Sequence, residues 1–129
     1  MIVVDCAALV DVLTGVEGSG ELRDRLLDED LHAPSLVDYE VVSALRGMVR
    51  RGALDAARAA AVLTDLDDLP MKRWPAHAEL RRRAWELRDA VSAYDAAYVA
   101  LAEALDCPLV TRDVRLARSS GHTAVVEVL

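Results

Sequence analysis

The sequence predicts an α/β domain of three layers, in which helices cover both faces of a mostly parallel sheet. Short apolar runs alternate with helical stretches along the whole chain, which is the pattern of consecutive βαβ units. The first run, Ile2-Val3-Val4, is apolar at every position, as in a strand that is covered on both faces. The chain has 129 residues without an internal repeat or a linker, so we expect residues 1–129 to form one domain.

Five strands are expected, and each is a short run rich in apolar residues and bounded by residues typical of turns. They cover residues 2–4, 31–33, 71–74, 108–111 and 124–128. Glu127 interrupts the last apolar run, which indicates a strand at the edge of the sheet.

Helices are expected between these strands. Ser35-Leu36-Val37-Asp38 and Ser92-Ala93-Tyr94-Asp95 each place an acid three residues after a serine, the pattern of a capping box, and we assign Asp38 to that role. The first box opens a helix whose apolar stripe is Val41, Val42, Leu45, Met48 and Val49. After a helical stretch that follows the first strand and a glycine-rich loop at 15–20, the expected helices cover residues 21–27, 35–52, 54–66, 76–90, 92–105 and 114–118.

The charge balance argues against a simple electrostatic grip on nucleic acid. The chain has 15 Lys and Arg against 22 Asp and Glu, a net charge of −7, whereas nucleic-acid binding usually requires a basic patch. Bound cations can reverse the local sign of the charge, so an acidic chain can still act on phosphates.

No apolar run approaches the roughly 20 residues of a membrane span. Cys6 and Cys107 lack any metal-ligand spacing, and so few cysteines favour a reducing cytoplasm.

Four acids are expected at one edge of the sheet. Ligands bind beyond the carboxyl ends of parallel strands, at the point where the strand order switches. Asp5 ends the first strand and Asp113 follows the fourth by two residues. Glu40 and Asp95 lie in the first turns of helices that begin at the same edge.

Each acid also has an ordinary structural interpretation. Asp5 and Asp113 could be helix N-caps, Asp95 the acid of its capping box, and Glu40 a solvated helix residue. Their joint placement favours a site, because like charges about 4 Å apart repel by about 4 kcal/mol at an effective dielectric of 20. A hard cation would offset that repulsion, and oxygen ligands favour Mg²⁺ or Mn²⁺. Such ions activate water and stabilise both oxygens of a phosphodiester displacement.

The sequence resembles the PIN-domain family, and within it the VapC-type toxins of toxin–antitoxin pairs. The matching segments are residues 3–10, 33–41, 92–102 and 108–116, and the last two are the most specific. The resemblance implies a three-layer α/β/α fold, Mg²⁺-dependent endoribonuclease activity in which Mn²⁺ can substitute, homodimerisation, and inhibition by a VapB-type antitoxin. It places the metal ligands at Asp5, Asp95, Glu40 and Asp113, and gives Thr111 the role of orienting a carboxylate or a water. The chain departs from the family at Cys6-Ala7, where the family has a small residue followed by Ser.

Arginines near the expected cleft are candidates for RNA contact, Arg112 and Arg115 first and then Arg118. The run Arg81-Arg82-Arg83 is better interpreted as a solvated helix rim. Trp74 and Trp85 are assigned to core or dimer packing, and the three histidines to structural or surface positions.

Three alternative protein classes make different demands on the sequence. A phosphatase with an aspartate nucleophile needs a second Asp two residues after the first, but that position is Ala7. A receiver domain needs an acceptor in the third strand and a Lys after the last, whereas residues 71–74 offer no acceptor and Lys72 is the only lysine. The remaining alternative is a catalytically idle PIN fold that serves only as a binding module. Intact acids at all four ligand positions argue against it.

Overall fold

A five-stranded parallel sheet runs through the middle of the molecule. The computed structural model describes all 129 residues, and the strand order is β3-β2-β1-β4-β5. The strands are β1 (Ile2–Val4), β2 (Leu31–Pro34), β3 (Met71–Trp74), β4 (Leu109–Thr111) and β5 (Val126–Val128). Every neighbouring pair is parallel, so the sheet is fully parallel where a mostly parallel one was expected. The last strand lies at an edge, as the position of Glu127 indicated.

The strand order reverses beside β1. The chain builds β1, β2 and β3 outward in one direction and then returns to add β4 and β5 on the other side of β1. The switch point therefore lies between β1 and β4, where Val4 pairs with Val110. This register brings the residues that follow, Asp5 and Thr111, next to each other at the carboxyl edge of the sheet.

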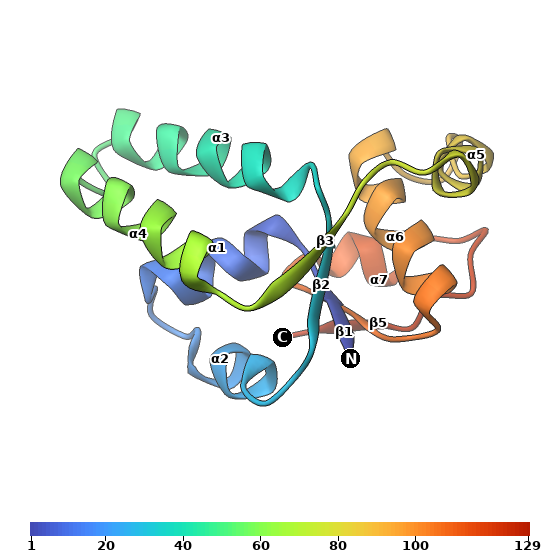
Figure 1. The fold of residues 1–129 in the computed structure, drawn as a ribbon, viewed down its shortest axis with the longest axis horizontal. Coiled ribbons are helices and arrows are strands. Elements are labelled where there is room, and N and C mark those ends of the chain that lie inside the picture. The colour runs from blue at the N-terminus through green and yellow to red at the C-terminus, as the bar shows by residue number, and fades with distance from the viewer.

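Helices cover both faces of the sheet, which confirms the three-layer prediction (Figure 1). One face carries the first four helices and the other carries the last three, with α6 packed against β1, β2 and β4. The helices are α1 (Cys6–Thr14), α2 (Gly20–Leu26), α3 (Val37–Arg50), α4 (Ala56–Asp68), α5 (Ala78–Glu86), α6 (Ala93–Leu105) and α7 (Val114–Ala117). None of them is long and apolar enough to cross a membrane.

The core is built from aliphatic side chains around β1 and α6. All three residues of β1 are completely buried, as a strand between two helix layers must be. A single cluster of 25 buried residues joins the strands to the inner faces of the helices. Because the chain has no Phe, valine, leucine and alanine supply most of this cluster. The buried part of α6 includes one polar exception, Tyr98, whose hydroxyl has a partner in the site.

The start of α3 differs from the prediction. Ser35 does not cap the helix, which begins at Val37 without a side-chain cap. The backbone N–H of Ser35 instead donates to the carbonyl of Trp74 at 2.8 Å, so Ser35 continues the contact between β2 and β3. Asp38 is not a capping acid either, because it accepts hydrogen bonds from Arg73 at 2.8 and 2.9 Å. An ion pair between α3 and β3 thus replaces the predicted local capping box.

The other helix boundaries follow the sequence more closely. Ser92 caps α6 by accepting from the N–H of Asp95 at 3.2 Å, as predicted. Asp55 caps α4 in the same manner, which moves that helix to 56–68. Val42 lies outside the buried stripe of α3 and is 45% exposed. The expected helix over residues 76–90 is shorter and covers Ala78–Glu86.

Candidate active site

Asp5 occupies the switch point of the sheet. It follows β1 directly, and its half-buried carboxylate is held from two sides. One oxygen accepts the N–H of Ala8 at 2.9 Å, so Asp5 caps α1. The other accepts the hydroxyl of Thr111 from the neighbouring strand. Asp5 is therefore an N-cap, and the two hydrogen bonds also fix its side chain at the carboxyl edge of the sheet.

Thr111 links the two strands that meet at this point. Its side chain is completely buried, and its hydroxyl accepts the N–H of Asp113 at 2.9 Å while it donates to Asp5. The hydroxyl therefore orients a carboxylate, which is one of the two roles that the family resemblance gave it. One buried side chain sets both the rotamer of Asp5 and the backbone that leads to Asp113.

Glu40 is held from the opposite layer of the molecule. It lies in the first turn of α3, and one of its oxygens accepts the hydroxyl of Tyr98 at 2.6 Å. Tyr98 lies on α6 and is 2% exposed, so the bond is shielded from solvent. Burial and the charge of Glu40 raise the pKa of the Tyr98 hydroxyl far above its usual range, which keeps it a donor. Sequence reasoning missed Tyr98, although its position one helical turn after Asp95 on an otherwise apolar face was an available signal.

Asp95 and Asp113 are the other two acids of the expected set, and neither accepts a hydrogen bond from a buried side chain. Asp95 is half-buried in the first turn of α6, and its carboxylate accepts no hydrogen bond from the chain. Asp113 caps α7 through the N–H of Arg115 and also pairs with the Arg115 guanidinium at 3.2 Å. Hydrogen bonds from Arg115 hold the pKa of Asp113 below its usual range. Arg115 itself is 91% exposed, so solvent screens this pair.

The carboxylates act on one another electrostatically. Burial raises the pKa of Asp5, and the charges of Asp95 and Asp113 add to the effect against the hydrogen bonds from Thr111 and Ala8. Burial likewise raises the pKa of Glu40, opposed by the Tyr98 bond and supported by the charges of Asp95 and Asp5. No arginine, lysine or histidine forms an ion pair with Asp5, Glu40 or Asp95. The structure thus brings the acids into one negative field that lacks a compensating cation at its centre.

The donor chemistry of this cluster suits a hard divalent cation, but the side chains do not form a closed cage. No three His, Cys, Asp or Glu side chains are grouped closely enough to hold an ion by themselves. Mg²⁺ ordinarily keeps several waters and takes one or two carboxylates directly. The residues present therefore supply the type of donor that Mg²⁺ takes, without a complete set of protein ligands.

The arginines that were candidates for RNA contact have different surroundings. Arg112 donates to Asp11 at 2.8 Å and to the main-chain oxygen of Leu129 at 2.7 Å, so its donors are engaged within the fold. Arg115 is bound only to Asp113, and Arg118 is exposed.

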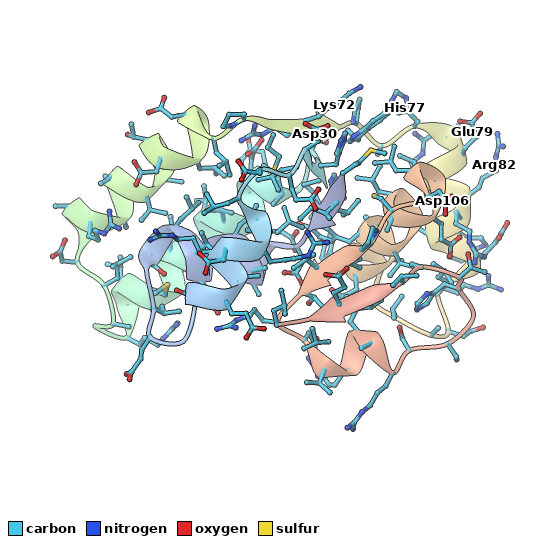
Figure 2. The ribbon with its side chains drawn as sticks, turned by 90° about the horizontal axis from the view of Figure 1, so that it is seen from below. Asp30, Lys72, His77, Glu79, Arg82 and Asp106 are labelled. Atoms are coloured by element: carbon cyan, nitrogen blue, oxygen red, sulfur yellow. The ribbon has the colours of Figure 1, made fainter.

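The arginine run on α5 divides in two. Arg81 and Arg82 are exposed, and Arg82 lies at the outer margin of the molecule (Figure 2). Arg83 departs from the predicted solvated rim, because it donates to Glu103, Glu86 and the carbonyl of Gly121 and so ties α5, α6 and the following loop together.

Aromatic side chains and histidines outside the carboxylate cluster have structural surroundings. Trp74 donates to the ring nitrogen of His32 at 3.0 Å, and His122 bonds to Ser119. Cys6 is half-buried, and burial raises the pKa of its thiol to about 12, so it is not a reactive thiolate. Trp85 is 67% exposed, so it does not pack in the core of this chain.

Two hollows lie on this side of the molecule, and of the four acids only Glu40 lines one of them. The first, which we name the acid-side hollow, has a volume of about 530 Å³. Its lining is Cys6, Leu36, Tyr39, Glu40, Ser43, Ala44 and Tyr94. The second, which we name the apolar groove, has a volume of about 500 Å³ and lies along α5 and the start of α6. Leu80, Ala84, Trp85, Val91 and Leu101 supply much of its apolar lining, and Tyr94 and Leu36 line both hollows.

Comparison with known proteins agrees with this arrangement. Residues 2–121 match the model of the PIN domain. The chain belongs to the PIN-domain family. This PIN domain is 39% identical over 129 residues to Ribonuclease VapC12 of Mycobacterium tuberculosis, covering all of this chain and 99% of the relative. It is 45% identical over 129 residues to Ribonuclease VapC9 of the same organism, covering all of this chain and 98% of the relative.

A solved structure shares the fold of this PIN domain. VapBC2 from Rickettsia felis, crystallised with a DNA fragment from its promoter, superposes with a TM-score of 0.71. The match covers 99% of this chain and 98% of that one, at 15% identity. The recognised family and the fold therefore agree with the α/β architecture expected from the sequence.

Proposed function

We propose that this chain is a metal-dependent endoribonuclease and the toxin of a type II toxin–antitoxin pair. The observation that carries the proposal is the half-buried Asp5 carboxylate at the switch point, which Thr111 fixes and whose pKa burial and the neighbouring acids raise. Full-length relatives that are named VapC ribonucleases support the choice of RNA as the substrate. Without a cation, the neighbouring carboxylates repel one another and destabilise the fold. Binding of Mg²⁺ or Mn²⁺ would offset this repulsion.

In this proposal the chain's own residues position the reaction. Asp5 and Asp95 would hold the ion most directly, with Glu40 and Asp113 completing the set. Mg²⁺ bound by these acids would supply an activated water and offset charge on the leaving oxygen. The product of such a hydrolysis is a pair of RNA ends, because the water oxygen bonds to phosphorus as the bond to the ribose oxygen breaks. Thr111 and Tyr98 keep Asp5 and Glu40 in place through hydrogen bonds that do not reorganise during the reaction.

Brief expression of the lone chain, followed by sequencing of cellular RNA ends, tests the activity. New ends should collect at a restricted set of sites and should be absent when Asp95→Asn is expressed at the same level. An identical set of ends from both proteins would contradict the proposal. The same experiment identifies the RNA that is cut.

Two protein partners follow from the same proposal. The antitoxin is a small protein whose apolar helix occupies the apolar groove and whose extension places an Arg among the four acids, where bidentate bonds replace the ion. The VapBC2 neighbour supports a VapB-type partner. Co-purification with the product of the adjacent gene tests this, and inhibition should compete with Mg²⁺.

The second partner is another copy of the chain. Light scattering on the purified protein measures its mass in solution and so tests whether it is a dimer.

A further inference from the structure

The exposed aromatic residues are unusually placed. The chain has only five aromatic side chains other than histidine, and three of them lie mostly in solvent. Tyr39 is 83% exposed and Tyr94 is 67% exposed, and both line the acid-side hollow together with Glu40. Tyr39 directly precedes Glu40 and Tyr94 directly precedes Asp95. The two exposed tyrosines are therefore next to the carboxylates both in sequence and in space.

The net charge of the chain does not explain how it would gain affinity for RNA. A net charge of −7 repels phosphates, and phosphate contacts ordinarily supply most of the affinity for nucleic acid. Of the arginines near the carboxylates, Arg112 donates to Asp11 and Leu129, and Arg115 pairs with Asp113, which offsets their charges; Arg118 alone is exposed without an ion pair. Stacking of bases on aromatic rings is the other general source of affinity for unpaired strands, and it does not depend on the charge of the protein.

We propose that Tyr39 and Tyr94 form a subsite in the acid-side hollow that stacks an unpaired RNA base next to the phosphate to be cut. The inference rests on the proposed ribonuclease function and adds to it a base-binding site. Leu36 and Ala44 give the hollow apolar walls for a ring, and Ser43 and Glu40 supply polar atoms at its margin. A paired base cannot offer its face to this site, so the site selects unpaired segments. Stacking on the rings would supply the affinity that the acidic protein does not gain from the RNA phosphates.

The test measures binding and cleavage separately. The probe is a fluorescent single-stranded RNA that spans a cleavage site, together with the same RNA made abasic at the two nucleotides that flank the cut. Binding is measured by anisotropy in the Asp95→Asn background with Mg²⁺, so that it does not depend on cleavage. The test substitutions are Tyr39→Ala, Tyr39→Phe and Tyr94→Ala. Val42→Ala is the matched control, because Val42 is an exposed apolar residue of the same helix that does not line the hollow.

Loss of a stacked base corresponds to about 1–3 kcal/mol, so Tyr39→Ala should weaken binding by roughly 5- to 160-fold. Tyr39→Phe should restore it, because the ring face is kept and only the hydroxyl is lost. The Ala variant should bind intact and abasic RNA equally, whereas the parent should prefer the intact strand. In an Asp95-containing protein the same substitution should raise KM more than it lowers kcat. Val42→Ala should bind as the parent does.

Unchanged affinity in Tyr39→Ala would overturn the subsite, as would an equal loss on intact and abasic RNA. A shift in the mass of the free protein on Tyr39→Ala, seen by light scattering, would assign the tyrosine to a contact between copies of the chain and would also overturn it. Base-dependent binding without any cleavage by the parent would contradict the proposed ribonuclease and leave the base site standing. Cleavage that does not depend on Tyr39 or Tyr94 would overturn the base site and leave the proposed ribonuclease standing.

Discussion

The four acids of the site fall into two pairs that the fold treats differently. Asp5 and Glu40 each accept a hydroxyl from a buried side chain, Thr111 and Tyr98, and neither touches a cation. Asp95 accepts nothing from the chain, and Asp113 depends on an exposed arginine. Buried donors therefore hold the first pair, whereas Asp113 is held only by the N–H and guanidinium of Arg115 and Asp95 by no donor of the chain. We name Asp5 and Glu40 the inner pair and Asp95 and Asp113 the rim pair, because the fold gives a buried hydroxyl donor to each acid of the first pair and to neither acid of the second.

The largest effect is expected from the inner pair. Asp5→Asn should reduce RNA cleavage by about 100-fold or more, because it removes the charge that holds the ion at the switch point. Thr111 can still bond to the amide, so the fold should survive, and the loss of one like charge should slightly raise the Tm of the metal-free protein. Cleavage assays and thermal melts of the purified variant measure both. Asp67→Asn, an exposed acid of α4 without an ion pair, is the control and should cleave normally.

The buried hydroxyl on Glu40 should matter next. Tyr98→Phe should lower cleavage by about 10- to 100-fold, the usual effect of removing a group that orients a metal ligand. Tyr98 acts through Glu40, so adding Tyr98→Phe to Glu40→Gln should cause little further loss. Full additivity of the two substitutions would show that Tyr98 does not work by fixing Glu40. Mg²⁺ titration of the melting temperature provides a second reading, because the ion should bind Tyr98→Phe more weakly.

Metal binding should stabilise the parent by a smaller but direct effect. An ion that binds only the folded cluster adds about 2.7 kcal/mol to the free energy of unfolding at 100 times its Kd. Mg²⁺ or Mn²⁺ at that concentration should therefore raise the Tm by about 10 °C, and EDTA should reverse the rise. The shift should disappear in Asp5→Asn and should only weaken in Asp113→Asn, since Asp113 belongs to the rim pair. Equal Tm shifts in Asp5→Asn and Asp113→Asn would contradict the distinction between inner and rim acids.

The smallest effect is the dependence of metal-free stability on pH. The pKa values of Asp5 and Glu40 are raised in the folded protein, so the folded state binds more protons than the unfolded state in this range. The stabilisation is complete below the unfolded pKa values and is lost as pH rises through the folded ones. Denaturant melts across the mildly acidic range should therefore show stability falling with rising pH. Glu40→Gln should flatten this slope, whereas Asp67→Asn should leave it unchanged.

Much of the architecture was accessible from the sequence, because it depends on local patterns. The uninterrupted apolar run of β1, the alternation of strands with helices, and the Ser92 cap all follow from side chains close in sequence. The start of α3 was not accessible, because Ser35 and Asp38 bind Trp74 and Arg73 on a strand more than 30 residues away. Local capping chemistry was present in the sequence, and tertiary pairing replaced it.

The site shows the same division. Asp5 and Asp113 could be placed at the carboxyl edge because each follows a strand, and Glu40 and Asp95 because each begins a helix. The bond between Glu40 and Tyr98 spans 58 positions and joins opposite helix layers, so no spacing rule predicts it. The engagement of Arg112 by Asp11 is a similar case across 101 positions. Sequence reasoning finds the edge at which a site lies, and long-range pairing decides which side chains are fixed there and which stay free.

Cleavage of a labelled RNA by the purified chain tests the central claim most directly. The RNA should be one that is cut during expression, and the reactions should contain Mg²⁺, Mg²⁺ with excess EDTA, or Mg²⁺ with the Asp95→Asn variant. The account predicts cleavage at the same position as in the cell in the first reaction, and a loss of about 100-fold or more in the other two. Cleavage that persists at the parent rate in EDTA, or in Asp95→Asn, would contradict a metal-dependent ribonuclease built on these carboxylates.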